Sequence, residues 1–165
     1  FWVPNIQGKT DMMPGQVNVT SLVADEPGVY RGQCAEYCGA QHALMAFLFV
    51  AEPQEAFDAW LEQQAQPAVA PDTAQAVHGR EVFFDSGCAS CHTVRGTRAA
   101  GDEGPDLTHL AGRRTLAAAT VPNRIGHLGG WITDPQHIKP ESLMPPTEMS
   151  PDNLQSLLRY LGGLE

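Results

Sequence analysis

Four side chains that bind soft metal ions lie within twelve residues of one another: Cys34, Cys38, His42 and Met45. Two thiolates, an imidazole and a thioether are typical of copper electron-transfer sites. A single blue-copper ion would use one cysteine, whereas two cysteines at C-x-x-x-C spacing can bridge a pair of copper ions. The alternatives are a zinc site, which leaves Met45 unexplained, and a Cys34–Cys38 disulfide, which explains neither His42 nor Met45.

The other two cysteines of the chain form the pattern C-x-x-C-H, read as Cys88-Ala89-Ser90-Cys91-His92. This is the attachment signature of a c-type haem. The two thiols can form thioethers to the vinyl groups of one porphyrin, and His92 would be the proximal iron ligand. A redox C-x-x-C motif is expected within a βαβ pattern, which is missing here. A zinc site would need two more ligands at matched spacing, and no second C-x-x-C follows.

Strand-like patterns precede residue 53. Alternation predicts strands over residues 16–20 and 29–34, and the apolar run at 45–51 predicts a buried strand. We therefore expect an all-β domain over residues 1–52, too small to be a complete sandwich.

A short helix and a linker follow, over residues 53–73. Residues 54–62 fit an amphipathic helix with three apolar side chains on one face, those of Phe57, Trp60 and Leu61. Residues 63–71 consist mainly of Gln, Ala and Pro, which predicts a semi-extended linker that buries nothing.

Helical patterns dominate residues 74–165. They predict helices over residues 74–85, around 123–133, and after Ser150, where a hydroxyl N-cap is followed by proline and an acid. Leucines recur at helical spacing after Ser150 until Gly162-Gly163 ends the helix. Such a small helical fold with long loops needs something else to fill its middle.

Charge and composition narrow the function classes. The 165 residues carry a net charge of −9, which argues against nucleic acid and favours a basic protein partner. The longest apolar run, residues 43–51, is far shorter than the roughly 18 residues of a membrane helix. The chain begins at Phe1 with no leader pattern, so we expect a fragment or a processed form.

The copper-like cluster resembles the dinuclear CuA loop of cytochrome c oxidase subunit II, a cupredoxin-like domain. The match reads C-x-E-x-C-x-x-x-H-x-x-M through Cys34, Glu36, Cys38, His42 and Met45. The resemblance implies that both cysteines bridge two coppers, that His42 and Met45 are terminal ligands, and that the Glu36 carbonyl is a further ligand. It also implies a magnesium contact for the Glu36 carboxylate, at the boundary with the catalytic subunit.

The same family places one more copper-binding histidine, and two transmembrane helices, ahead of the Phe-Trp-Val-Pro stretch. Nitrous-oxide reductase shares the copper ligands but has an aromatic-rich loop, so it is the weaker resemblance.

Residues 76–164 resemble a class I cytochrome c, an all-α fold. Gly79 and Phe83 before the haem signature, with Leu157 and Tyr160 in the last helix, resemble the terminal helix crossing of that family. Gly79 would let the two helices approach closely.

The cytochrome resemblance also implies the other haem contacts. The Pro105 carbonyl would hold the His92 ring. Met144, followed by two prolines, would be the axial ligand, with Met149 as its competitor. Arg113 or its neighbour Arg114 would pair with a haem propionate, and Trp131 would pack beside it. Four histidines lack ligand spacing and are predicted to be ordinary surface or loop residues: His78, His109, His127 and His137.

A copper domain followed by a cytochrome c resembles subunit II of the caa-type haem–copper oxidases. This implies an electron relay from a donor through haem c to CuA and on to catalytic subunit I, where dioxygen is reduced. It places the chain on the outer, periplasmic face of a membrane, anchored by the preceding helices. A stand-alone haem/copper reductase and a copper-delivery module are the alternatives.

Overall fold

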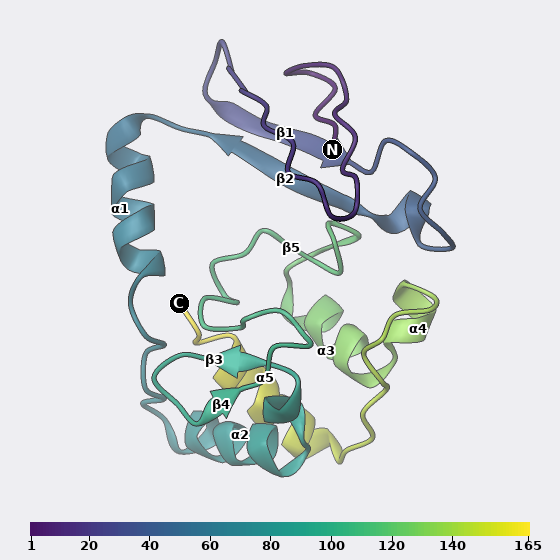
Figure 1. The fold of residues 1–165 in the computed structure, drawn as a ribbon. Helices are drawn as coiled ribbons and strands as arrows, with labels where there is room; N and C mark the ends of the chain where they lie inside the picture. The colour runs from purple at the N-terminus through teal and green to yellow at the C-terminus, as the bar shows by residue number, and fades with distance from the viewer.

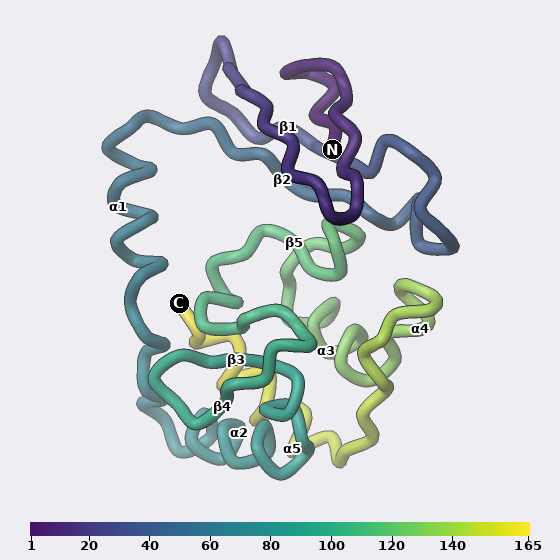
Figure 2. The backbone as a smooth tube through the Cα atoms, viewed as in Figure 1, coloured from purple at the N-terminus to yellow at the C-terminus, as the bar shows by residue number.

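The structure is a computed structural model that describes residues 1–165. Figures 1 and 2 show two parts, a β-hairpin with irregular loops and a helical part below it, connected along one side by helix α1 (Gln54–Gln64). None of the helices combines the length and the apolar character needed to span a bilayer.

The first part is built on one antiparallel hairpin, β1 (Gly28–Gln33) and β2 (Ala46–Ala51). Gly28 lies opposite Ala51, and Gln33 lies opposite Ala46. Trp2 forms a bridge to Gln33. The expected strands at 29–34 and 45–51 are confirmed, each within one residue of its predicted start.

The predicted strand at residues 16–20 is wrong. Val17 and Val19 are 91% and 90% exposed, and the segment is irregular. Side-chain hydrogen bonds hold it as a loop: Asn18 Nδ2 donates to Asp11 O, and Gln7 Nε2 donates to Thr20 Oγ1. An alternating pattern becomes a strand only beside a partner backbone, and β1 and β2 pair with each other.

Helix α1 exists as predicted and runs two residues further. Its apolar side chains remain largely in solvent: Phe57 is 42% exposed, Trp60 48% and Leu61 52%. The Phe57 and Trp60 rings contact one another with centroids 5.8 Å apart.

The segment after α1 packs against the helical part, so the prediction that it buries nothing is wrong. Arg95 donates from Nη2 to Gln64 O (2.5 Å) and from Nη1 to Ala65 O (3.3 Å). The Ala68 amide donates to Arg95 O (2.9 Å), and the Ala68 side chain contacts the core. The free carbonyls at a helix C-terminus need donors, and here a distant arginine supplies them.

The helical part contains α2 (Ala74–Asp85), α3 (Ile125–Thr133), α4 (Pro135–Ile138) and α5 (Pro151–Leu161). The three predicted helices correspond to α2, α3 and α5. The Ser150 hydroxyl accepts from the Asn153 amide at 3.2 Å, as the N-cap pattern predicts.

Two small hairpins interrupt this helical part, which is therefore not purely α. They pair β3 (Thr93–Val94) with β4 (Ala99–Ala100), and β5 (Thr115–Leu116) with β6 (Val121–Pro122). The core beneath them is formed mainly by α2, α3 and α5, and its most deeply buried side chains are those of Phe83, Val94, Leu157 and Leu164.

Helices α2 and α5 cross at Gly79. A Cβ at this position would overlap the Ser156 carbonyl oxygen, so only glycine lets the backbones come this close. The Phe83 and Tyr160 rings meet edge to face beside the crossing, with centroids 5.8 Å apart. The predicted terminal crossing is confirmed.

The loop between β5 and β6 has an unusual backbone. Ala117, Ala118 and Ala119 have φ angles of 53°, 56° and 58°, which is one turn of left-handed helix. Each such residue costs roughly 1–2 kcal/mol when it carries a Cβ. Within the loop, the Thr120 amide donates to Leu116 O at 3.1 Å.

Candidate metal centres

The end of the β1–β2 hairpin positions the first cluster. The Cys34 amide donates to Met45 O (2.9 Å), which extends the strand ladder and places these residues opposite one another. The chain between them turns through a short 3-10 helix, His42–Leu44, and this returns His42 toward the cysteines.

The cluster has the geometry of an open sulfur–imidazole site. The ligand atoms of Cys34, Cys38 and His42 all lie within 4.8 Å of one another. Cys38 Sγ is 3.8 Å from His42 Nδ1 and 3.8 Å from Met45 Sδ. All four cysteines of the chain are free thiols, so the structure has no Cys34–Cys38 disulfide.

The donors of this cluster fit copper. Cys34 Sγ lies 3.1 Å from the Glu36 carbonyl oxygen, the backbone atom that the resemblance implies as a further ligand. Copper favours soft thiolate, thioether and imidazole donors, and all three lie together here. A hydrogen bond with Cys34 raises the pKa of the Cys38 thiol, so metal binding at this pair would release protons.

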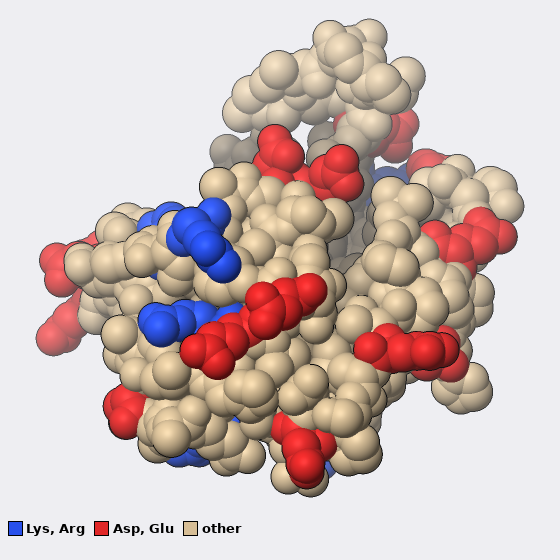
Figure 3. Space-filling model, turned by 90° about the horizontal axis from the view of Figure 1, so that it is seen from below, with Lys and Arg blue, Asp and Glu red and all other residues tan.

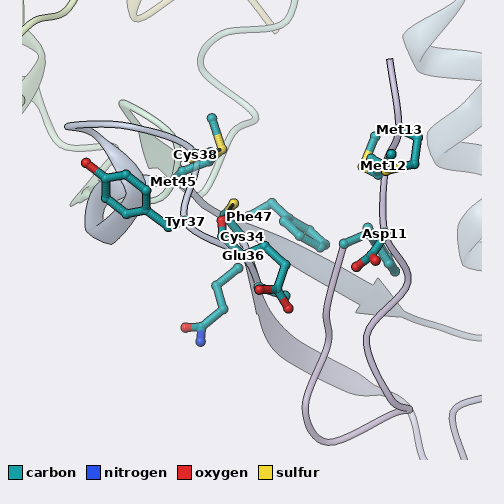
Figure 4. Close-up of a pocket in the computed structure, with 12 residues that line it drawn as sticks. Asp11, Met12, Met13, Cys34, Glu36, Tyr37, Cys38, Met45 and Phe47 are labelled. Atoms are coloured by element: carbon teal, nitrogen blue, oxygen red, sulfur yellow. Dashed lines mark hydrogen bonds between the residues drawn. The ribbon is translucent and has the colours of Figure 1, made fainter. Parts of the chain in front are cut away.

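A cavity of about 600 Å³ opens beside the cluster. Figure 4 shows Cys34, Cys38 and Met45 on one side of this cavity. Met12 and Met13, in an irregular segment near the N-terminus, lie on the opposite side. Most of its lining is apolar, which would limit the access of water to a metal bound at the thiols.

The Glu36 carboxylate points away from the thiols and pairs with Lys9. The hydrogen bond from Lys9 lowers the pKa of Glu36 and raises that of Lys9 itself. The magnesium contact of this carboxylate stays a prediction.

The second cluster follows α2 directly. Gly87, in the left-handed region at φ 78°, ends the helix, and a 3-10 turn over Cys88–Ser90 follows. Burial raises the pKa of the Cys88 thiol. Cys88, Cys91 and His92 therefore lie on one short segment directly after the helix, and Cys88 packs against the core.

The His92 ring is oriented by backbone groups. Its Nδ1 lies 2.8 Å from Pro105 O, the contact that the cytochrome resemblance implies. Because a carbonyl only accepts, Nδ1 carries the proton and Nε2 keeps a free lone pair. A Cβ at Gly104 would lie 2.5 Å from His92 Cε1, so the backbone is a close cradle for this ring. A histidine held in this tautomer fits the role of an iron ligand.

The other predicted haem contacts lie around the same core. Met144 and Met149 both pack against it, so the assignment of Met144 rests on its loop sequence. Trp131 is half-buried in α3. Arg113 Nη2 donates to the carbonyl oxygen of Asp106, next to Pro105, and its pairing with a propionate stays a prediction.

A polar network that the sequence did not reveal braces the Pro105 loop. The Asp106 carboxylate accepts from the Thr108 amide (2.7 Å) and hydroxyl (2.5 Å) and lies 3.5 Å from Arg95 Nε. The Arg95 amide donates to Thr108 Oγ1 at 2.9 Å. The D-x-T pattern of an Asx turn was the available signal, whereas the distant Arg95 gave none.

His109 lies in a turn between β4 and β5, so it is a loop residue as the prediction allows, but it is buried and not on the surface. It is 7% exposed, and its Nε2 lies 3.1 Å from Gln66 O in the segment after α1. The packing of that segment onto the helical part buries the ring. A partner 43 residues away leaves no local pattern in the sequence.

Comparisons with known proteins match each part of the chain to a family. Residues 76–165 match the family Cytochrome c, and residues 1–51 match the family Cytochrome C oxidase subunit II, periplasmic domain. Cytochrome c oxidase subunit 2 of Alkalihalophilus pseudofirmus is 41% identical over all of this chain and 48% of its own length. The protein of the same name from Bacillus sp. (strain PS3) is 33% identical over all of this chain and 49% of its own length.

The chain thus spans about half the length of these curated relatives. Among solved structures, the c-type cytochrome SorU from Sinorhizobium meliloti is similar over 53% of this chain and 87% of its own, with 22% identity and a TM-score of 0.39. On its sequence matches, the chain belongs to the cytochrome c family through residues 76–165, and it carries ahead of them the periplasmic-domain sequence of cytochrome c oxidase subunit II.

Proposed function

We propose that this chain is the electron-transfer part of subunit II of a respiratory terminal oxidase. The observation that carries the proposal is the presence of two different ligand sets on one chain: the Cys34–Cys38–His42 cluster beside Met45, and Cys88, Cys91 and the oriented His92. When bound, dinuclear copper and covalent haem c would each carry one electron.

The hairpin end is the copper-binding region in this proposal. Cys34 and Cys38 would bridge the two ions, His42 and Met45 would be terminal ligands, and the Glu36 carbonyl would be a further one. A second histidine would come from the part of the longer protein that precedes this chain. The hydrogen bond from the Cys34 amide to Met45 O fixes the backbone at these two residues, which would limit movement of the ligand set when the oxidation state changes.

The helical part is the haem-binding region. Cys88 and Cys91 would attach the porphyrin, and Pro105 holds His92 so that Nε2 is free to bind. Met144 would supply the opposite ligand and keep water from that position. Arg113 and Trp131 are assigned to the propionate side.

Electrons would enter from a soluble cytochrome c or an upstream respiratory complex and leave toward catalytic subunit I. Dioxygen reduction would belong to that partner, because both proposed ligand sets, once the second histidine is included, would be filled by protein groups and would leave no position for a substrate. The chain would lie on the periplasmic side, held there by the membrane helices of the longer protein, with the Glu36 carboxylate near a magnesium ion at the subunit boundary.

Metal analysis with optical and EPR spectra of the full-length protein tests this function. We expect two coppers and one iron per chain, a low-spin six-coordinate haem, and the multi-line signal of one electron shared by two coppers. Cys38→Ser should abolish the copper signal and leave the haem spectrum unchanged, whereas His92→Ala should do the reverse.

Other spectra would contradict the proposal. A high-spin haem that binds added ligands would point to a stand-alone haem/copper reductase. A single exchangeable copper without the mixed-valence signal would point to a copper-delivery module.

A further inference from the structure

The left-handed turn at residues 117–119 is a run of consecutive non-glycine residues with positive φ, whereas Glu141, the other non-glycine residue with positive φ, stands alone. Three consecutive alanines have φ between 53° and 58°. Residues with a Cβ visit this region singly and seldom in succession. Such strain persists only where surrounding contacts fix it, and it is concentrated at functional positions.

The carbonyl groups of this turn contact the other part of the chain. Ala118 O accepts from the Ala46 amide at 3.1 Å, and Ala119 O accepts from Arg31 Nη1 at 3.4 Å. Figures 1 and 2 show the loop after β5 reaching up to the β1–β2 hairpin. A right-handed turn would direct these carbonyls elsewhere, so the left-handed backbone and the contact depend on one another.

A third hydrogen bond joins the same two parts. Gln41 Nε2 donates to Pro140 O at 3.1 Å. Gln41 precedes His42, and Ala46 follows Met45, so both donors are sequence neighbours of the copper-cluster residues. Pro140 lies in the loop that leads to Met144. The contact therefore joins the ligand loops of the two centres directly.

We propose that the left-handed alanine turn is a docking element whose occupant is the copper-binding hairpin of the same chain, and that this docking sets the electron path from the haem region to the copper region. The inference about the path rests on the proposed function, whereas the docking itself does not. Few hydrogen bonds suffice, because α1 and the segment after it keep the two parts at high local concentration.

A matched pair of substitutions at Ala118 tests the docking in the full-length, metal-loaded protein. Glycine adopts a left-handed backbone without cost, whereas β-branched valine strongly disfavours it. In Ala118→Val we expect the Ala46 amide to exchange its hydrogen about tenfold faster or more, because it loses its acceptor. In Ala118→Gly we expect exchange within about twofold of the natural protein.

Arg31→Ala tests the contact from the opposite side and leaves the haem region unaltered. It should speed exchange at Ala46 by about threefold. Arg159→Ala removes an equal charge from the exposed face of α5 and should have no effect. If Ala118→Val fails to fold, the exchange rate of the Ala46 amide in Arg31→Ala, compared with that in Arg159→Ala, tests the docking.

The rate of electron transfer between the two centres, measured after flash reduction of the haem, gives the second readout. Ala118→Val should slow it by about tenfold or more, while Ala118→Gly should not. Unchanged exchange at Ala46 in both Ala118→Val and Arg31→Ala would overturn the docking.

Faster exchange at Ala46 with an unchanged transfer rate would overturn the proposed path and leave the electron-transfer function standing. Absence of the haem and dinuclear-copper spectra in the unsubstituted protein would instead overturn the proposed function. The hydrogen-exchange comparison would still decide whether the turn docks.

Discussion

Single backbone groups determine the chemistry that His92 can perform. The Pro105 carbonyl accepts a hydrogen bond from Nδ1–H of His92, and the Gly104 backbone lies against the ring edge. Together they fix both the tautomer and the ring plane before any ligand binds. The Asp106 carboxylate, bound to Thr108 and close to Arg95, holds the loop that presents this carbonyl.

Gly104→Ala should displace the His92 ring. The added Cβ would lie 2.5 Å from Cε1 and 2.7 Å from Nδ1, well inside van der Waals contact. We expect the haem-binding part to lose about 1–3 kcal/mol of stability, measured as its thermal midpoint followed by visible absorbance. The matched control is Gly112→Ala, where the nearest atom, His109 O, lies 3.7 Å away. Equal thermal midpoints for the two variants would contradict the close contact between the Gly104 backbone and the His92 ring.

Asp106 should make stability depend on pH in the acid range. Burial pushes its pKa up, but hydrogen bonds from Thr108 and the charges of Arg95 and Arg113 outweigh this, so the pKa lies below its ordinary value. A carboxyl with a lowered folded pKa stabilises the fold above its unfolded pKa of about 4, and the stabilisation is lost as pH falls through the folded value.

Asp106→Asn should therefore destabilise the protein at pH 7, and the difference from the natural protein should shrink below about pH 4. Denaturant unfolding at several pH values measures this. A difference that stays constant down to pH 3 would show that the carboxylate charge plays no part.

Among the elements, the α2–α5 crossing does most to hold the helical part together. Gly79→Ala would force a Cβ into the Ser156 carbonyl, a backbone atom that cannot rotate away. We expect a loss of about 1–3 kcal/mol or more, seen as a lowered thermal midpoint. Gly126→Ala in α3 is the control, because its Cβ would meet nothing within 4 Å; it should stabilise by up to about 1 kcal/mol. Comparable losses in both would contradict the close crossing.

The elements that the sequence predicts well are those with local signals. The Ser150 cap, the leucine spacing after it and the C-x-x-C-H pattern each lie within a few residues, and α5 and the cysteine turn follow from them. The strand expected at 16–20 failed because pairing depends on a second backbone. The burial of His109 and the capping of α1 by Arg95 could not be predicted, because each joins residues at least 30 apart.

The copper-like cluster also combines features with a local sequence signal and features that depend on long-range contacts. Its candidate ligands could be identified from one sequence pattern, and the end of the hairpin brings the ligand atoms of Cys34, Cys38 and His42 within 4.8 Å of one another. The Lys9–Glu36 pair and the left-handed turn beneath the hairpin have no sequence signature, since both join distant segments. Local patterns thus identified the candidate ligands, and long-range hydrogen bonds connect the two parts that carry them.

Across the whole molecule, acidic groups outnumber basic ones by 19 to 10. On the face that carries α2 and α5, acidic side chains are spread widely, while the few basic ones gather at one side (Figure 3). A donor with a positive surface would be attracted to such a face over roughly one Debye length, about 10 Å at 0.1 M salt.

Reduction of the haem-binding part by a basic donor cytochrome should therefore slow as salt increases. Between about 0.02 M and 0.5 M salt we expect the second-order rate constant to fall about tenfold or more, because screening removes the steering. Stopped-flow absorbance measures the rate, and a small uncharged reductant is the control, whose rate should change less than about twofold. A donor rate as insensitive to salt as the control would show that the net charge of −9 does not guide association.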